Sequence, residues 1–148
     1  MATEQLKLNN QVCFPLYSAS RLITQAYQPY LDELGITYPQ YLVLLVLWES
    51  DEVSVNDIAK KLILKTNTLS PLLQRMAKLE LIDRNRSFED ERCVVINLTK
   101  KGKELEKKAA TIPEKMMENL LSESVELEDV IQLKHQLNQL IEILNKKK

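Results

Sequence analysis

Residues 54–99 read SVNDIAKKLILKTNTLSPLLQRMAKLELIDRNRSFEDERCVVINLT, and this segment is the most informative about the fold. Ser54 begins an S-x-x-D motif, which caps a short helix predicted over Val55 to Leu62. A turn then leads to a second helix, predicted from Thr66 to Glu80. Its apolar residues recur at helical spacing: Leu69, Leu72, Leu73, Met76 and Leu79. The pattern predicts a helix-turn-helix in which the second helix has one apolar and one polar face.

Two strand-like segments follow this pair of helices. The first is Leu81 to Arg86 and the second is Arg92 to Leu98, with a turn predicted at Phe88 to Glu91. Side chains of the second segment alternate with the period of a half-buried strand: Val94, Ile96 and Leu98 against Cys93, Val95 and Asn97. A two-stranded hairpin after a helix-turn-helix predicts a winged helix-turn-helix, in a chain that is mainly α-helical with a small β-hairpin wing.

The residues before this stretch predict two longer helices. The first runs from about Asn10 to Tyr30, on the helical spacing of Leu16, Ala19, Ile23 and Ala26. A turn at Leu34 to Ile36 follows, and a T-x-x-Q capping box at Thr37 then begins the second helix, which ends near Ser50 and Asp51. Its apolar run, Tyr41 to Trp48, is too short to span a bilayer, so we expect a buried helix and no membrane partner.

The residues after the hairpin also predict two helices. Thr99 caps one that reaches about Leu120, with a bend at Pro113. A last helix is predicted from Ser124 to Leu144, with apolar residues at heptad spacing: Val130, Leu133, Leu137, Leu140 and Leu144. Together with the apolar first helix, this stripe predicts a homodimer interface. The alternative is that both helices pack against their own domain.

Charge is distributed unevenly along the 148 residues. Net charge is -1, but Ser54 to Lys103 holds 11 Lys and Arg against 6 Asp and Glu, and the remainder holds 9 against 15. A basic middle between acidic ends suits a protein that presents one face to phosphates, although solvated charges could also fall this way by chance. We expect one domain over 1–148, with dimerisation regions at 8–34 and 104–148 and a DNA-binding region at 54–103.

The polar face of the second helix meets the demand of major-groove recognition, which is for short hydrogen-bonding side chains at base edges. These side chains are Thr66, Thr68, Ser70, Gln74 and Arg75. The hairpin adds Arg84, Arg86 and Arg92, as a wing that contacts phosphates or the minor groove requires. Asp90 is predicted to orient Arg92 through a charge-assisted bond. A two-fold dimer would read double-stranded DNA at a palindromic operator. The alternatives are a solvated helix face and a casual surface ion pair.

Two sets of motifs resemble a known family. Asp90-Glu91-Arg92 followed by V-x-I-x-L-T and K-K-G (Val94 to Gly102) resembles the wing of MarR-family regulators. QVCFPLYSASR (Gln11 to Arg21) and LDELGITYPQYLVLLVLWE (Leu31 to Glu49) are similar to the organic hydroperoxide resistance regulators, the OhrR branch. The resemblance covers essentially the whole chain.

This resemblance implies a dimeric repressor whose amino-terminal cysteine is oxidised by organic hydroperoxides, after which the operator is released. The reactive cysteine maps to Cys13, the tyrosines that hydrogen-bond it map to Tyr27 and Tyr38, and Tyr17 is placed in the same pocket. Independently, Cys13 and Tyr27 are fourteen residues apart on one predicted helix, about 21 Å at roughly 1.5 Å per residue. They could meet only if the first helices of two subunits run antiparallel.

The chemistry expected of Cys13 needs a thiolate, which helix amino termini and hydrogen-bond donors favour. Its apolar neighbours Val12, Phe14 and Leu16 would favour a hydrophobic hydroperoxide. The other cysteine, Cys93, is expected to be a partly exposed passenger, so oxidised Cys13 would be capped by a low-molecular-weight thiol or overoxidised. An inert core residue is the alternative reading of Cys13.

Other functions are less well supported by the residues. A single histidine, His135, with two distant cysteines has no usual zinc spacing, and no phosphate-binding loop is visible, so we expect no metal, no cofactor and no enzyme. The absence of a leader over Met1 to Asn10 predicts a cytoplasmic protein. The alternatives are a MarR-type repressor gated by a small aromatic ligand, a thiol peroxidase and a helical adaptor.

Overall fold

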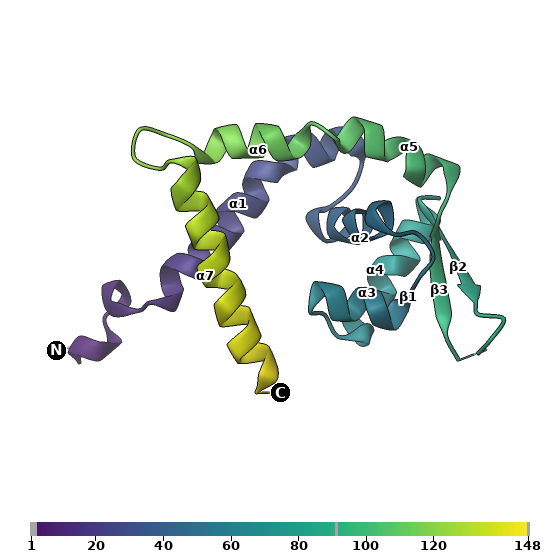
Figure 1. Ribbon diagram of the computed structural model, residues 1–148, viewed down its shortest axis with the longest axis horizontal. Helices are drawn as coiled ribbons and strands as arrows, with labels where there is room; N and C mark the ends of the chain where they lie inside the picture. Colours follow the sequence, from purple (N-terminus) through teal and green to yellow (C-terminus); the bar gives the residue numbers. More distant parts are fainter. Residues whose placement is uncertain (1–2, 91, 148) are drawn as a thin grey trace. The chain divides into compact units, whose positions relative to one another are not determined.

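A computed structural model describes residues 3–90 and 92–147 of the chain. The architecture is mainly α-helical, with one small antiparallel sheet (Figure 1). Two compact units are present, one up to Ala110 and the other from Thr111. The predicted winged helix-turn-helix is confirmed, and all of its elements belong to the first unit.

Helices α3 (Val55–Leu62) and α4 (Thr66–Lys78) form the helix-turn-helix. Ser54 caps α3 as predicted, because its Oγ accepts the backbone N–H of Asp57 at 3.1 Å. Helix α3 ends at Ile63, whose φ of 56° is left-handed and turns the chain into α4. The core side of α4 is buried at Leu69, Leu72, Leu73 and Met76. The prediction that Leu79 belongs to this side is wrong, because α4 ends at Lys78 and the side chain of Leu79 is 39% exposed.

The sheet contains one strand more than the sequence predicted. Strands β2 (Ile82–Arg86) and β3 (Val94–Leu98) form the hairpin, in a register from Ile82 opposite Leu98 to Arg86 opposite Val94. The predicted two-stranded hairpin is confirmed, and strand β1 (Val53–Ser54), which was not predicted, pairs with the other edge of β3. A two-residue strand has no detectable alternation, which is why the pattern missed it. The predicted turn ends on Glu91, which lies outside the described residues.

Helix α1 (Cys13–Leu34) is displaced from its predicted bounds at both ends. Asn10 belongs to the second of two short 3-10 helices, η1 (Glu4–Leu6) and η2 (Leu8–Asn10), so α1 does not begin there. The helix continues through Pro29 and ends at Gly35, where φ is 70° and the N–H donates to the carbonyls of Asp32 and Leu31. Glycine adopts this conformation without a Cβ clash.

Helices α2 (Tyr38–Glu49) and α5 (Lys100–Ala109) have the caps that the sequence predicted. Thr37 and Gln40 form a capping box, in which the Thr37 N–H donates to Gln40 Oε1 at 3.0 Å. Thr99 Oγ1 accepts the N–H of Gly102 at 3.0 Å. A Cβ on Gly102 would lie 2.3 Å from the carbonyl oxygen of Leu81, so only glycine lets α5 approach the root of the hairpin this closely.

The second unit holds α6 (Ile112–Leu120) and α7 (Leu127–Lys146). The prediction of one helix from Thr99 to Leu120 is wrong, because the helix is interrupted between Ala109 and Ile112. The reason is Pro113, which has no N–H to donate to the carbonyl of Ala109. Helix α7 starts at a Glu126–Asp129 capping box, later than the predicted Ser124. No helix within residues 3–90 and 92–147 is long and apolar enough to cross a membrane.

Candidate nucleic-acid interface and thiol pocket

The outer face of α4 carries the five side chains predicted to read DNA. Thr66, Thr68, Gln74 and Arg75 are exposed and Ser70 is half-buried, whereas the leucines and the methionine of the same helix are buried. Helical periodicity separates the two faces, because the buried positions recur at intervals of three and four residues. The outer face is therefore free to contact a partner through hydroxyl, amide and guanidinium groups.

The hairpin carries the three predicted arginines. Arg84 and Arg86 are exposed on β2 and stand two residues apart, so they lie on one face of the strand. Arg92 is also exposed, but it precedes β3 instead of belonging to it as predicted. The strand begins after Arg92 because Cys93 still belongs to the turn, where its N–H donates to the Asp90 carbonyl at 2.9 Å.

A concave surface of about 180 Å³ joins the helix-turn-helix to the hairpin. It gathers Thr66 and Ser70 from α4, and Arg84 and Arg92 from the hairpin. The start of α3 completes one side of it with Asn56 and the Ser54 cap. Four of the residues predicted from sequence thus line one hollow of polar and cationic groups, whereas Thr68, Gln74, Arg75, Arg86 and Asp90 lie outside its lining.

The predicted role of Asp90 needs a correction. Its Oδ1 accepts the backbone N–H of Arg92 at 3.0 Å, and no ion pair joins its carboxylate to the Arg92 guanidinium among the described residues. Asp90 therefore shapes the turn of the hairpin through the backbone, in the manner of an Asx turn. Arg92 itself lines the concave surface.

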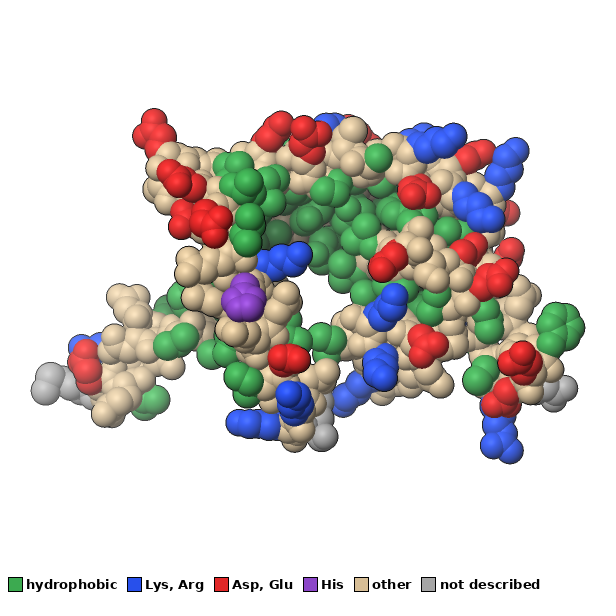
Figure 2. Space-filling view, in the orientation of Figure 1, with side chains coloured by type: hydrophobic (Ala, Val, Ile, Leu, Met, Phe, Trp, Pro, Cys, Tyr) green, Lys and Arg blue, Asp and Glu red, His purple; other side chains and the backbone are tan. Residues whose placement is uncertain are grey.

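Basic side chains are visible over α5 and beside the hairpin in the space-filling view, interspersed with acidic ones (Figure 2). The Lys residues of α5 continue the basic segment that begins at Lys60. One of them, Lys101, donates to the carbonyl of Leu79 at 2.8 Å. The positive character is therefore local to the first unit and does not depend on the net charge of the chain, which is -1.

Cys13 is the first residue of α1, and its side chain is exposed in the single chain. Its neighbour Val12 is 89% exposed, and Phe14 and Leu16 are 40% and 44% exposed. The expected apolar surround is thus present in sequence, but one chain alone does not bury it. Because α1 is unbroken from Cys13 to Leu34, Cys13 and Tyr27 are separated by about 21 Å of helix at roughly 1.5 Å per residue.

Two of the three tyrosines of the predicted thiol pocket come together. The rings of Tyr27 on α1 and Tyr38 on α2 have centroids 5.0 Å apart. Tyr41 joins them at 5.8 Å from Tyr27 and 6.2 Å from Tyr38, and we call these three residues the tyrosine cluster. Burial raises the pKa of all three phenols above 10.0, and the neighbouring phenols add to this for Tyr27 and Tyr41. Each phenol therefore keeps the proton that it could donate.

Tyr17 lies at the other end of α1, one helical turn from Cys13. It is 64% exposed, and the Arg21 guanidinium stacks over its ring with 4.7 Å between the Arg21 Cζ and the ring centroid. Within one chain Tyr17 therefore shares a helix end with Cys13 and lies apart from the tyrosine cluster. The i, i+4 spacing of Tyr17 and Arg21 could have indicated this pair from sequence alone.

The second cysteine and the single histidine do not form a metal site. Cys93 is half-buried, lines the concave surface, and its Sγ lies 3.8 Å from Asp90 Oδ2. His135 is exposed on α7. Across residues 3–90 and 92–147, no group of three or more His, Cys, Asp or Glu is arranged to hold a metal ion. The sequence did not indicate the part of Tyr41 in the tyrosine cluster, because its apolar neighbours predict only a core position. It also did not indicate Asn56, which belongs to no recognisable binding motif.

Comparison with known proteins identifies the relatives of this chain. Residues 25–109 match the family model described as transcriptional regulator SarA/Rot. The organic hydroperoxide resistance transcriptional regulator of Bacillus subtilis (strain 168) is 47% identical over 144 residues, 97% of this chain and 96% of the relative. The regulator MgrA of Staphylococcus aureus is 38% identical over 115 residues, 77% of this chain and 78% of the relative.

Solved structures give the same answer. Reduced AbfR bound to DNA is 35% identical, with a TM-score of 0.79 over 97% of this chain and 99% of that one, and another matched structure is of AbfR from Staphylococcus epidermidis. AbsC of Streptomyces coelicolor, a MarR family transcriptional regulator, is 25% identical with a TM-score of 0.82 over 97% of this chain and 99% of that one. The chain therefore belongs to the MarR family of transcriptional regulators, in the branch of the organic hydroperoxide resistance regulators.

Proposed function

We propose that this chain is a DNA-binding transcriptional repressor that leaves its operator when an organic hydroperoxide oxidises Cys13. The observation that carries this proposal is the 47% identity to a regulator of organic hydroperoxide resistance along nearly the whole chain. The AbfR structures supply a second support, because that relative binds DNA and has been described in reduced, overoxidised and disulfide forms. No enzymatic turnover and no cofactor are required.

DNA recognition is assigned to residues 54–103. The outer face of α4 would enter the major groove, where hydroxyl, amide and guanidinium groups reach base edges: Thr66, Thr68, Ser70, Gln74 and Arg75. The hairpin would contact phosphates or the adjacent minor groove through Arg84, Arg86 and Arg92, with Asp90 holding the shape of the turn. The concave surface that joins helix and hairpin supports this division of labour.

Dimerisation is assigned to residues 8–34 and 104–148, within a single functional domain over 1–148. Support comes from apolar side chains of α7 that are exposed to solvent in a single chain: Leu133, Leu140 and Leu144 are 53%, 48% and 62% exposed. A two-fold homodimer would present two α4 helices to the half-sites of a palindromic operator. Acting on DNA, such a repressor would work in the cytoplasm.

The redox site would be shared between two copies of the chain. Cys13 cannot reach Tyr27 along one unbroken helix, so the phenols of Tyr27 and Tyr38 would serve the Cys13 of the partner, with Tyr17 beside that thiol. The thiolate would attack the terminal oxygen of the hydroperoxide and break its O–O bond. Sulfur then carries the hydroxyl as a sulfenic acid, and the alkoxide takes a proton and leaves as the alcohol. A low-molecular-weight thiol would next displace water and form a mixed disulfide with Cys13.

Fluorescence anisotropy on a labelled palindromic duplex tests this function. Wild type, Cys13→Ser and Cys93→Ser are titrated with and without an organic hydroperoxide. We expect the peroxide to release wild type and Cys93→Ser, and to leave Cys13→Ser bound. Equal release of all three variants would overturn the redox mechanism and favour a repressor gated by an aromatic ligand. A lack of DNA binding by reduced wild type would overturn the repressor itself.

A further inference from the structure

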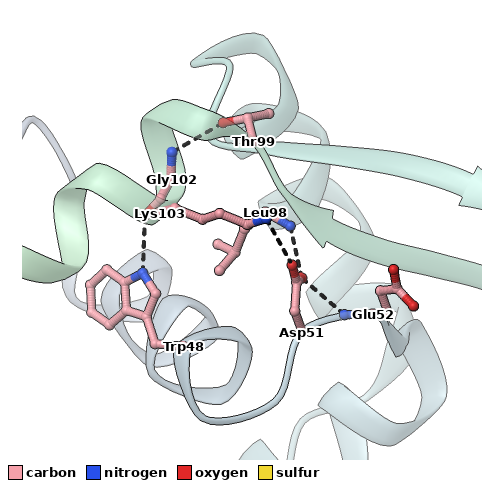
Figure 3. Close-up of polar contacts among 7 residues, drawn as sticks. All are labelled: Trp48, Asp51, Glu52, Leu98, Thr99, Gly102 and Lys103. Atoms are coloured by element: carbon pink, nitrogen blue, oxygen red, sulfur yellow. Dashed lines mark hydrogen bonds and ion pairs between the residues drawn. The ribbon is translucent and has the colours of Figure 1, made fainter.

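The end of α2 is attached to the root of the hairpin by two side chains. The indole Nε1 of Trp48 donates to the carbonyl oxygen of Gly102 in the first turn of α5, at 3.0 Å. Asp51 Oδ1 accepts the backbone N–H of Leu98, the last residue of β3, at 2.9 Å (Figure 3). The same Oδ1 accepts the N–H of Glu52 at 2.9 Å, so the backbone that follows α2 also holds the carboxylate in place. We call Trp48 and Asp51 the clamp.

Both partners of the clamp lie where the hairpin joins the body of the first unit. Leu98 pairs with Ile82 in the sheet, and it is followed by Thr99, whose N–H donates to the Leu81 carbonyl at 3.1 Å. Gly102 packs closely against that same carbonyl group, because a Cβ added to it would lie only 2.3 Å from the carbonyl oxygen. Asp51 Oδ2 also lies 4.0 Å from Lys103 Nζ (Figure 3). Movement at the end of α2 would therefore displace both β3 and the start of α5.

The other end of α2 carries the tyrosine cluster. Tyr38 is its first residue, and Tyr41 lies one turn later. Tyr41 and Trp48 are seven residues apart, almost two full turns, so they share a face of α2. Their rings contact edge to face, with centroids 6.3 Å apart. Packed contacts thus run without a gap from Tyr27 through Tyr38, Tyr41 and Trp48 to Gly102.

We propose that Trp48 and Asp51 are positioning residues that couple the tyrosine cluster to the DNA-contacting hairpin. The proposal deepens the proposed function, because it names how a change beside the thiol reaches Arg84 and Arg92. Helix α2 is buried along most of its length, and close-packed side chains transmit a displacement from one end of such a helix to the other. Coupling of this kind requires that a change at the tyrosine cluster alters the hairpin, and that the alteration depends on the clamp.

Amide hydrogen exchange of the hairpin, in reduced protein without DNA, tests the coupling without any peroxide. Tyr38→Ala disturbs the cluster, and Asp51→Ala removes the acceptor of the Leu98 N–H. We expect each substitution alone to speed exchange in β2 and β3, and Tyr38→Ala to add nothing further once Asp51 is alanine. Effects that multiply in the double variant, or no effect of Tyr38→Ala on the hairpin, would overturn the proposal.

DNA binding provides the second readout, as the ratio of Kd after peroxide to Kd before it. Asp51→Ala and Trp48→Phe are expected to reduce this ratio from about tenfold or more to within about threefold, since an uncoupled hairpin no longer follows the cluster. Asp51→Asn keeps an oxygen acceptor for Leu98 and should retain the ratio. Glu49→Ala, an exposed acid of the same helix, is the matched control and should also retain it.

The two readouts separate the possible failures. A merely structural role would weaken DNA binding equally before and after peroxide, and an unchanged ratio in Asp51→Ala would overturn the clamp. Where Asp51→Ala does not fold, Trp48→Phe carries both measurements, because it removes the N–H donor and keeps an aromatic ring against Tyr41. If wild type itself does not respond to peroxide, the proposed function fails, and hydrogen exchange still decides whether the clamp couples the two regions.

Discussion

The phenol rings of Tyr27 and Tyr38 meet across α1 and α2 with centroids 5.0 Å apart, tilted by 49°. The pairing brings together two helices that are adjacent in sequence but are joined through the turn at Gly35. Burial raises the pKa of both phenols, so each remains a hydrogen-bond donor at neutral pH. A thiolate or sulfenate brought against this pair by a second copy of the chain would find two donors already in place.

Removing these donors should slow oxidation of Cys13 and leave the fold intact. Tyr27→Phe and Tyr38→Phe keep the rings that pack on Tyr41, so we expect the rate of reaction with organic hydroperoxide to fall by about tenfold or more for the double variant. Stopped-flow measurement of thiol loss gives this rate. Tyr41→Phe is the comparison, because Tyr41 is 3% exposed and its hydroxyl is the least able to reach a thiol on another chain. An equal effect of Tyr41→Phe would contradict the assignment.

Alkaline pH should destabilise the protein through the tyrosine cluster. The pKa of Tyr38 is raised above 10.0 in the folded chain, so the unfolded chain loses its proton first as the pH rises. Stability is therefore full below about pH 10 and falls as the pH rises through the folded pKa. Urea unfolding between pH 8 and pH 11 should show a smaller loss in the free energy of unfolding for Tyr38→Phe than for wild type. Tyr17→Phe, at a largely exposed position, should lose as much free energy of unfolding as wild type does.

The wing arginines should contribute electrostatically to DNA binding. Arg92→Ala and Arg84→Ala each remove one cation from the concave surface. We expect each to weaken binding on specific and unrelated duplexes alike, and to lower the slope of log Kd against log salt by about one. Gln74→Ala, on the outer face of α4, should instead weaken binding to the operator more than binding to an unrelated duplex. Titrations at several salt concentrations distinguish these patterns, and an unchanged slope for both arginines would exclude them from phosphate contact.

Gly102 should not tolerate a side chain. Gly102→Ala would place a Cβ 2.3 Å from the carbonyl oxygen of Leu81, which belongs to the backbone and cannot rotate away. We expect a loss of about 1–3 kcal/mol in the free energy of unfolding, as for other overpacked sites. Urea denaturation measures this loss. A neutral substitution would show that α5 can move away from the hairpin without cost.

Sequence patterning predicted the parts of this fold that depend on local signals. Capping residues Thr37, Ser54 and Thr99 marked three helix starts, and each cap is present. Helix ends were placed less well. The first helix was predicted to end near Tyr30, but it continues through Pro29 as far as the predicted turn at Gly35. Pro113 was predicted to bend one helix, but two helices are present because its missing N–H cannot continue the first. The two residues of β1 were missed because their pairing with β3 is non-local.

The candidate site could be predicted in part. Residue types on the outer face of α4 and in the hairpin identified the polar surface, and spacing along α1 excluded contact between Cys13 and Tyr27 in one chain. The contribution of Tyr41 and the link from Asp51 to Leu98 could not be predicted, because both depend on tertiary packing between elements far apart in sequence. The side chain of Asp90 was misassigned for the opposite reason, since a local backbone bond satisfied it.

Simultaneous measurement of Cys13 oxidation and DNA release decides whether oxidation of this thiol releases the operator. Operator-bound protein is titrated with substoichiometric organic hydroperoxide, and each sample is divided between anisotropy and mass spectrometry of a trapped sulfenic acid. We expect the fraction of DNA released to rise together with the fraction of Cys13 oxidised, while Cys93 stays a thiol. Release of DNA with Cys13 still reduced, or complete oxidation of Cys13 with DNA still bound, would exclude Cys13 as the switch.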